Sequence, residues 1–174
     1  MVIRDALPGE LPAVGELRVA AYAAGGFLSP ADGYAPQLRA LGTGGEGSVL
    51  VAVTADADAR ATRHIVGTVM LQSWSPAAEI VTSPDEAEIR ALAVAPGAQG
   101  SGIGGALLRA VLARAARQGI RHLVLSTRQE MHAAHRLYEQ AGFRRLPDRD
   151  WFPEPETKLL VYGLRLDQQA PPRD

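Results

Sequence analysis

The stretch EAEIRALAVAPGAQGSGIGG, from Glu86 to Gly105, decides the fold of this chain. Its middle part, Ile89 to Val94, is a strand-type run, which Pro96 must end. A cluster of glycines follows, and after it apolar residues recur at intervals of three and four. These apolar residues are Ile103, Leu107, Leu108, Val111, Leu112 and Ala115. The stretch therefore predicts a strand, a glycine-rich turn and a helix with one apolar face.

The turn before this helix has the composition of an anion site. The first amides of a helix have no acceptor within the helix, and the helix dipole adds partial positive charge there. Gly100, Gly102, Gly104 and Gly105 carry no side chains that would keep a ligand away from these amides. Each glycine in a helix also lowers its stability by about 1 kcal/mol relative to alanine, which favours a functional reason for four of them. The sequence therefore predicts a phosphate or pyrophosphate site, with a ligand-free glycine turn as the alternative.

Two common phosphate motifs do not fit the stretch well. A P-loop needs a lysine directly after its glycines, and none follows here. Gly100, Gly102 and Gly105 satisfy the GxGxxG pattern literally, but residues 95–99 separate the strand from the first glycine, where a dinucleotide-binding turn is tight. The next expected strand, 120–126, is also not followed by an acid that could hold a ribose hydroxyl. An NADP-dependent oxidoreductase is therefore only a remote alternative.

Three short motifs, in order along the chain, resemble the GCN5-related N-acetyltransferase (GNAT) family. Gln99-Gly100-Ser101-Gly102-Ile103-Gly104 matches the family signature [Arg/Gln]-x-x-Gly-x-[Gly/Ala]. The upstream Leu-Ala-Val-x-Pro is present from Leu92 to Pro96, and the downstream Ala-x-x-Leu-Tyr-x-x-x-Gly-Phe from Ala134 to Phe143. The close match covers residues 86–145, whereas the first 80 residues resemble the family only in their order of elements.

Composition sets the broad class. The chain has 174 residues, 18 basic and 19 acidic side chains, a net charge of −1 and no cysteine. A domain of this size buries roughly 70% of its unfolded surface and needs no metal or disulfide to fold. The balanced charge gives no basic field for nucleic acid, and no apolar run approaches the roughly 20 residues of a membrane helix. We therefore expect one cytoplasmic domain over residues 1–166, without nucleic-acid, membrane or metal partners, and a disordered tail at 167–174.

The remaining patterns predict an α/β chain. Hairpin-forming strands come first and β-α-β units follow, which favours a mixed sheet with helices on both faces. The expected strands are 1–5, 48–53, 64–72, 89–94, 120–126, 143–146 and 158–166, and the expected helices are 11–23, one from Ser29–Asp32 to before Gly42, one from Ile103 to before Gly119, and 130–141. Residues 55–62 and 147–157 are expected to be loops. The resemblance implies the same architecture: a mostly antiparallel sheet of six or seven strands, flanked by about four helices and splayed between its fourth and fifth strands.

The resemblance implies an acyltransferase that uses acetyl-CoA. Helix-start amides would bind the pyrophosphate, and exposed strand edges would pair with the pantetheine arm. Met131 stands where many members carry an asparagine that contacts this arm, and methionine can pack there without the same hydrogen bonds. The expected cofactor residues are Leu92, Ala93, Val94, Gln99, Gly100, Ser101, Gly102, Ile103, Gly104, Gly105, Met131 and Tyr138.

Glu88 and Tyr138 are the expected catalytic residues. An alkylamine has a pKa near ~10.4 and must lose a proton before it attacks, so a base is useful. Glu88 stands where some family members carry a catalytic glutamate, and Glu86 is a second candidate. Tyr138 matches the family's proposed acid for the departing thiolate. The alternatives are an ion-paired carboxylate for Glu88 and a packed aromatic for Tyr138.

The sequence gives less specific signals for the site of the acceptor amine than for the cofactor site. Phe27 and Tyr34 are candidates for lining the acceptor pocket, with an ordinary core role as the alternative. The resemblance implies direct attack of a primary amine in a ternary complex, with a small-molecule amine or a peptide N-terminus as acceptor. A catalytically silent acyl-CoA-binding sensor on the same fold is the alternative. Many members dimerise, so a homodimer through the last strands, with the Trp151–Phe152 segment, is a further hypothesis.

Overall fold

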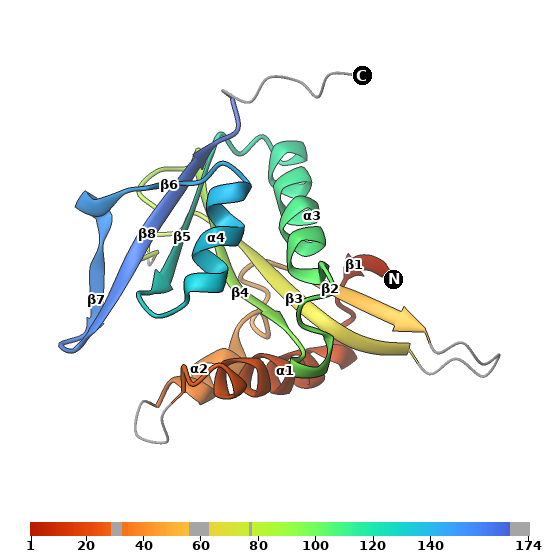
Figure 1. The fold of residues 1–174 in the computed structure, drawn as a ribbon. Helices are drawn as coiled ribbons and strands as arrows, with labels where there is room; N and C mark the ends of the chain where they lie inside the picture. Colours follow the sequence, from red (N-terminus) through yellow and green to blue (C-terminus); the bar gives the residue numbers. More distant parts are fainter. Residues whose placement is uncertain (29–32, 56–62, 77, 168–174) are drawn as a thin grey trace. The chain divides into compact units, whose positions relative to one another are not determined.

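The computed structural model describes residues 1–28, 33–55, 63–76 and 78–167. In these residues the chain forms eight strands and four α-helices (Figure 1). The strands are β1 (Val2–Asp5), β2 (Ser48–Ala55), β3 (Arg63–Ser73), β4 (Glu86–Val94), β5 (His122–Arg128), β6 (Arg144–Arg145), β7 (Trp151–Glu154) and β8 (Thr157–Arg165). The helices are α1 (Leu11–Ala24), α2 (Tyr34–Ala40), α3 (Ile103–Arg117) and α4 (His132–Gln140). The predicted α/β class is confirmed, with eight strands where six or seven were expected.

The strands pair in the order β1-β2-β3-β4-β5-β8-β6, and β7 pairs with β8. The pairs β1–β2, β2–β3, β5–β8, β6–β8 and β7–β8 are antiparallel. The pair β4–β5 is parallel and joins Glu86–Glu88 to residues 122–124. The sheet is therefore mixed and mostly antiparallel, as expected.

The chain divides into two compact units, which share β4 and α3. Unit 1 comprises Met1–Gln72 and Ala91–Leu112, and unit 2 comprises Ser73–Arg90 and Ala113–Asp174. The glycine turn belongs to unit 1, whereas Glu88 and Tyr138 belong to unit 2. One domain over residues 1–166 stays a prediction.

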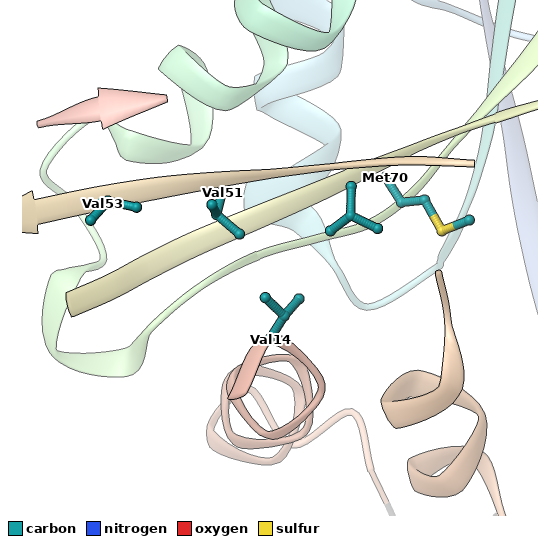
Figure 2. Packing of buried hydrophobic residues seen from close by; sticks show 5 residues of the cluster. Val14, Val51, Val53 and Met70 are labelled. Atoms are coloured by element: carbon teal, nitrogen blue, oxygen red, sulfur yellow. The ribbon is translucent and has the colours of Figure 1, made fainter. Parts of the chain in front are cut away.

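The core of unit 1 lies between α1 and the hairpin of β2 and β3. Side chains two residues apart on a strand point to the same face. Val49, Val51 and Val53 of β2 therefore share one face, and they are buried together with Met70 of β3. Figure 2 shows Val14 of α1 pointing at this face, where it completes the cluster. Leu11, also of α1, packs against the same cluster, so apolar contacts hold the helix on the hairpin.

The core of unit 2 is built around β5. Leu123, Val124 and Leu125 are all buried, so both faces of the strand are covered. Val124 packs with Ile80, Val81 and Val161 on one face. On the other face α4 runs alongside β5 and β8 (Figure 1), and Tyr138 of α4 packs on the rings of Phe143 and Tyr162.

Two boundaries in the structure differ from those expected, and three further expectations fall outside the described residues. The expected loop 147–157 contains β7, because Trp151 pairs with Leu159 and Glu154 with Thr157 to form a short hairpin with β8. The helix expected from residue 130 begins at His132, with Met131 as its N-cap. The helix start at Ser29–Asp32, most of the hairpin loop 55–62 and the tail after residue 167 lie outside the described residues.

No helix within the described ranges has both the length and the apolar character needed to cross a membrane.

The contribution of the unit 1 core can be measured with two valine-to-alanine substitutions in strands. Val51 is 0% exposed and Val2 is 63% exposed. We expect Val51→Ala to lower the free energy of unfolding by about 2 kcal/mol, from two lost methyl groups and the cavity that they leave. Val2→Ala, the matched control, should change it by less than about 0.5 kcal/mol. Urea denaturation measures both; equal effects would contradict the packing in Figure 2.

Candidate active site

The turn between β4 and α3 is braced by hydrogen bonds within unit 1. The Ala95 amide donates to the Val66 carbonyl of β3 (2.9 Å). A short 3₁₀ turn, Pro96–Ala98, follows. The side-chain amide of Gln99 then donates back to the Val94 carbonyl (3.2 Å), so this side chain spans the base of the turn.

Two of the glycines are required by the backbone conformation of the turn. Gly100 has φ 77° and Gly102 has φ 81°, in the left-handed region that costs other residues roughly 1–2 kcal/mol. A Cβ at either position would meet no atom within 4 Å. Crowding is therefore not the reason for glycine here, and the space beside both residues is open.

The helix start presents amides without helical acceptors. The first bond of the helical type runs from the Ala106 amide to the Gly102 carbonyl (3.1 Å). The amides of Ile103, Gly104 and Gly105 come before it, so none of them has an acceptor in α3. The first turn of α3 contains no acidic side chain that would occupy these donors. Together with the helix dipole, the three amides form a site suited to a phosphate group.

Gly67 of β3 sets how closely α3 approaches the strand. A Cβ at Gly67 would lie 2.8 Å from Leu107 Cδ1 and 3.0 Å from Ile103 Cγ2. Both of these α3 side chains are buried. The helix start is thus fixed against the backbone of a neighbouring strand by apolar contact.

Ala91 interrupts the regular backbone of β4. It has φ 50° and is the one residue other than glycine with positive φ in the part of the chain that the structure describes. The last described pair of β4 with β5 joins Glu88 to Val124, three residues earlier. Leu92, Ala93 and Val94 follow the interruption, and of these Ala93 is buried.

Glu88 is a buried carboxylate, and the ion pair described for it is a loose one. The residue is 9% exposed, and Arg90 Nε lies 3.7 Å from Glu88 Oε1. Burial raises the pKa of Glu88 to about 7, Arg90 lowers it, and the negative charge of Glu79 raises it. A carboxyl with this pKa can accept or release a proton near neutral pH.

Glu86, the second candidate base, has a different environment. Arg149 donates to both of its oxygens (2.9 Å each), Thr82 donates its amide (2.8 Å) and hydroxyl (3.0 Å), and His122 Nδ1 lies 2.7 Å away. Burial alone would raise the pKa of Glu86, but these hydrogen bonds outweigh it and hold the pKa at about 2. Glu86 is therefore a structural anion that joins Arg149 to β4 and β5.

Tyr138 is 8% exposed and packs between two aromatic rings, with centroids 5.9 Å from Phe143 and 6.3 Å from Tyr162. Burial raises the pKa of its hydroxyl above the ordinary value. The hydroxyl is therefore protonated at neutral pH, and it is a weaker acid than the hydroxyl of an exposed tyrosine.

Glu88 and Tyr138 lie on opposite faces of the strands of unit 2. Glu88 is paired with Val124 of β5. Tyr138 packs on Tyr162, which is paired with Leu125. Because Val124 and Leu125 are adjacent, their side chains point to opposite faces.

The other predicted site residues have simple packing environments. Met131 Sδ accepts a hydrogen bond from the Thr127 hydroxyl (3.5 Å), and its backbone caps α4. Tyr34 packs on Tyr22 of α1 (6.3 Å between ring centroids). The Phe27 amide donates to the Tyr22 carbonyl (2.9 Å), so Phe27 and Tyr34 both lie near the end of α1.

Reasoning from the sequence missed Ala91, Arg149 and Tyr22. No local signal marks an alanine with positive φ, and Arg149 lies 63 residues from its partner Glu86. Helical spacing placed Tyr22 on α1 but could not show its contact with Tyr34. Within the described ranges, no group of three histidines or carboxylates is placed to hold a metal ion.

Comparisons with known proteins agree with this geometry. The model of the acetyltransferase (GNAT) family matches residues 26–143. No curated protein matches the chain significantly.

Solved structures match along nearly the whole chain. A GNAT-family acetyltransferase from Staphylococcus aureus Mu50 has a TM-score of 0.69 and 19% identity, over 95% of this chain and 98% of its own. A Salmonella typhimurium protein solved with acetyl-CoA as its cofactor has a TM-score of 0.64 and 21% identity, and the match covers 99% of this chain and 98% of its own. The ribosomal-protein-S18-alanine N-acetyltransferase of Escherichia coli has a TM-score of 0.66 and 21% identity, and the match covers 99% of this chain and 98% of its own. At these identities the likeness concerns the fold.

The hydrogen-bonded cluster of Glu86 with Arg149, Thr82 and His122 predicts how the stability of the protein depends on acid pH. The folded-state pKa of Glu86 is about 2, against an ordinary 4.5. Its stabilising contribution is therefore complete above pH 4.5 and is lost as the pH falls from 4.5 towards 2. Glu86→Gln should lower the free energy of unfolding at pH 7 by about 2 kcal/mol and flatten its decline in this range.

Urea denaturation from pH 7 to pH 3 measures both effects. Glu16→Gln is the matched control, because Glu16 pairs with Arg39 on the surface, where solvent and salt screen the pair. The control should change stability little. An acid profile that Glu86→Gln leaves unchanged would contradict the described cluster.

Proposed function

Because the chain belongs to the GNAT family of acetyltransferases, we propose that it transfers an acetyl group from acetyl-CoA to a primary amine. The observation that carries this proposal is the glycine turn before α3. Positive φ at Gly100 and Gly102 leaves open space beside the turn, and the first three amides of α3 have no helical acceptor. A pyrophosphate fits such a set of donors.

The residues of the turn and of β4 suit a long, amide-bearing cofactor. The amides of residues 100–105 would bind the pyrophosphate, and Gln99 would keep the turn in place. Past Ala91, the backbone of Leu92–Val94 would pair with the amides of the pantetheine arm, as in an added strand. The acetyl-CoA in the related Salmonella typhimurium structure supports this choice of cofactor. Acetyl-CoA supplies an acetyl group activated as a thioester.

Glu88 is proposed as the base that receives the proton of the amine, directly or through a water. Alkylamines are mostly protonated at neutral pH, because their pKa lies near ~10.4. Only the neutral amine has the lone pair that attacks a carbonyl carbon. Glu88 has a pKa of about 7, so its carboxylate form is well populated at neutral pH and its basicity is higher than that of an exposed glutamate.

Tyr138 is proposed as the acid that protonates the departing sulfur. The new bond joins the amine nitrogen to the acetyl carbon, and the bond from that carbon to sulfur breaks. The nitrogen of a protonated amine loses two protons in all: the first goes to Glu88 before attack, and the second leaves after the bond to carbon has formed. The Tyr138 hydroxyl gives its proton to the sulfur, and the second proton from the nitrogen restores that hydroxyl, so atoms and charge balance. Glu88 on β4 would act on the amine, and Tyr138 on α4 would act on the sulfur.

The acceptor is proposed to be a small-molecule amine or a peptide N-terminus. The Escherichia coli neighbour is named for acetylating a ribosomal-protein alanine, which supports the second type of acceptor as a hypothesis for this chain. Phe27 and Tyr34, together with Tyr22, are proposed to line the acceptor side. A homodimer and a cytoplasmic location stay predictions.

The two alternative functions, an NADP-dependent oxidoreductase and a silent acyl-CoA-binding sensor, are not equally supported. Membership of the GNAT family removes the basis for an NADP-dependent oxidoreductase. A silent acyl-CoA-binding sensor would need the turn but not Glu88 or Tyr138, so substitution of these two residues separates it from an enzyme.

Cofactor binding is tested by thermal denaturation with acetyl-CoA, CoA and NADP. A ligand at 100 times its dissociation constant should add about 2.7 kcal/mol to the free energy of unfolding. We expect acetyl-CoA and CoA to stabilise the protein and NADP not to. Gly102→Ala should weaken both effects, since φ 81° disfavours alanine. Gly97→Ala is the control, because Gly97 has neither positive φ nor a close neighbour. Stabilisation by NADP alone would refute the proposal.

Catalysis is tested by the release of CoA thiol with a panel of amines. Tyr138→Phe should lower kcat roughly 100-fold or more while cofactor binding is nearly kept, because only the donated proton is lost. Tyr162→Phe, a neighbouring tyrosine outside the proposed chemistry, is the control and should change kcat little. Unchanged turnover in Tyr138→Phe would leave Tyr138 as a packing residue.

A further inference from the structure

The charges around Glu88 differ in kind from those around Glu86. Glu86 accepts directed hydrogen bonds on both oxygens. Glu88 faces the Arg90 guanidinium at 3.7 Å, which is an ion-pair distance and longer than a hydrogen bond. Arg90 thus stabilises the charge on Glu88 without fixing the carboxylate, whose lone pairs stay available for a proton.

Among the described residues of unit 2, both apolar and charged side chains lie near Glu88. Val124, its partner on β5, is apolar, and the charge of Glu86, on the same face of β4, is compensated by Arg149 and accompanied by His122 of β5. Glu79, in the segment before β4, is exposed and acts on Glu88 through its charge. Arg90 and Glu79 therefore act in opposite directions on the same carboxyl.

We propose that Arg90 is a positioning residue for acetyl transfer, whose ion pair with Glu88 at 3.7 Å keeps that carboxyl in its proton-accepting form at neutral pH. The inference rests on the proposed role of Glu88 as the base. Physically, burial disfavours the charged carboxylate, whereas a cation within about 4–6 Å favours it by 1–3 pKa units. Without Arg90, burial would act without this opposing cation, and a larger share of Glu88 would be protonated at pH 7.

The pH dependence of kcat/KM tests this inference, since it reports the ionisation of the free enzyme. The acid limb of this profile is the fall in kcat/KM as the pH drops through the pKa of Glu88. Arg90→Gln should shift this limb to higher pH by about one unit and preserve the limiting kcat/KM at high pH. Glu79→Gln should move the limb in the opposite direction, by a smaller amount because Glu79 is exposed and screened by salt. Arg90→Lys keeps a cation and should restore most of the original profile. All variants are assayed with one amine, so the ionisation of the amine is common to all.

Arg165→Gln is the matched control, because Arg165 is an exposed arginine of unit 2 that pairs with Asp167. Its acid limb should stay in place. A uniform loss of rate in Arg90→Gln at every pH, with an unmoved limb, would show a structural role and overturn the inference. If Arg90→Gln does not fold, Arg90→Met, which keeps most of the apolar stem, decides: an upward shift of the limb supports the inference and an unmoved limb overturns it.

Glu88→Gln separates this inference from the proposed function. If Glu88→Gln abolishes the acid limb of kcat/KM near pH 7, Glu88 is supported as the base. In that case, an acid limb that stays in place in Arg90→Gln would refute only the role of Arg90. A limb that survives in Glu88→Gln refutes the base itself and the inference with it. Binding of acetyl-CoA, measured by thermal shift, is expected to be the same in all of these variants.

Discussion

Ala91 takes a left-handed backbone within β4, and the chain on both sides of it is held in place. Before it, Glu86–Glu88 pair with β5, and Glu86 is bound to Arg149. After it, the Ala95 amide bonds to β3 and the glycine turn begins. A non-glycine residue at positive φ costs roughly 1–2 kcal/mol, so the neighbouring contacts must impose it. The described pairing of β4 with β5 ends at Glu88, before the residue with positive φ.

Two glutamates on one face of β4 show how environment decides the role of a side chain. Both are buried, and burial by itself raises the pKa of each. Glu86 receives hydrogen bonds from three residues and becomes a permanent anion, while Glu88 receives one distant charge and stays near its titration point. Arg149, on the segment before β7, thereby joins that segment to β4. The structural anion thus supports the strand that carries the proposed base.

The sequence was most informative where the relevant physics is local. Glycines, a proline and helical spacing predicted β4, the turn and α3, because each of these signals acts within a few residues. The class of fold followed from the order of such elements and from the family resemblance. The strand β7 was missed, because its pairing with β8 depends on a partner rather than on a strong strand pattern in residues 151–154. The difference in pKa between Glu86 and Glu88 was also beyond the sequence, since partners such as Arg149 come from distant segments.

Gly67 carries a consequence for how the affinity of the helix start is set. This residue lies in β3, and a methyl group there would press on Leu107 and Ile103 of α3. Ile103 is the first residue of α3, so pressure on it would displace the first amides of the helix. Under the proposed function, the strength with which these amides hold an anion would then depend on a residue that never touches the anion. For protein engineering, Gly67 is a position from which the helix start can be altered while the turn sequence stays intact.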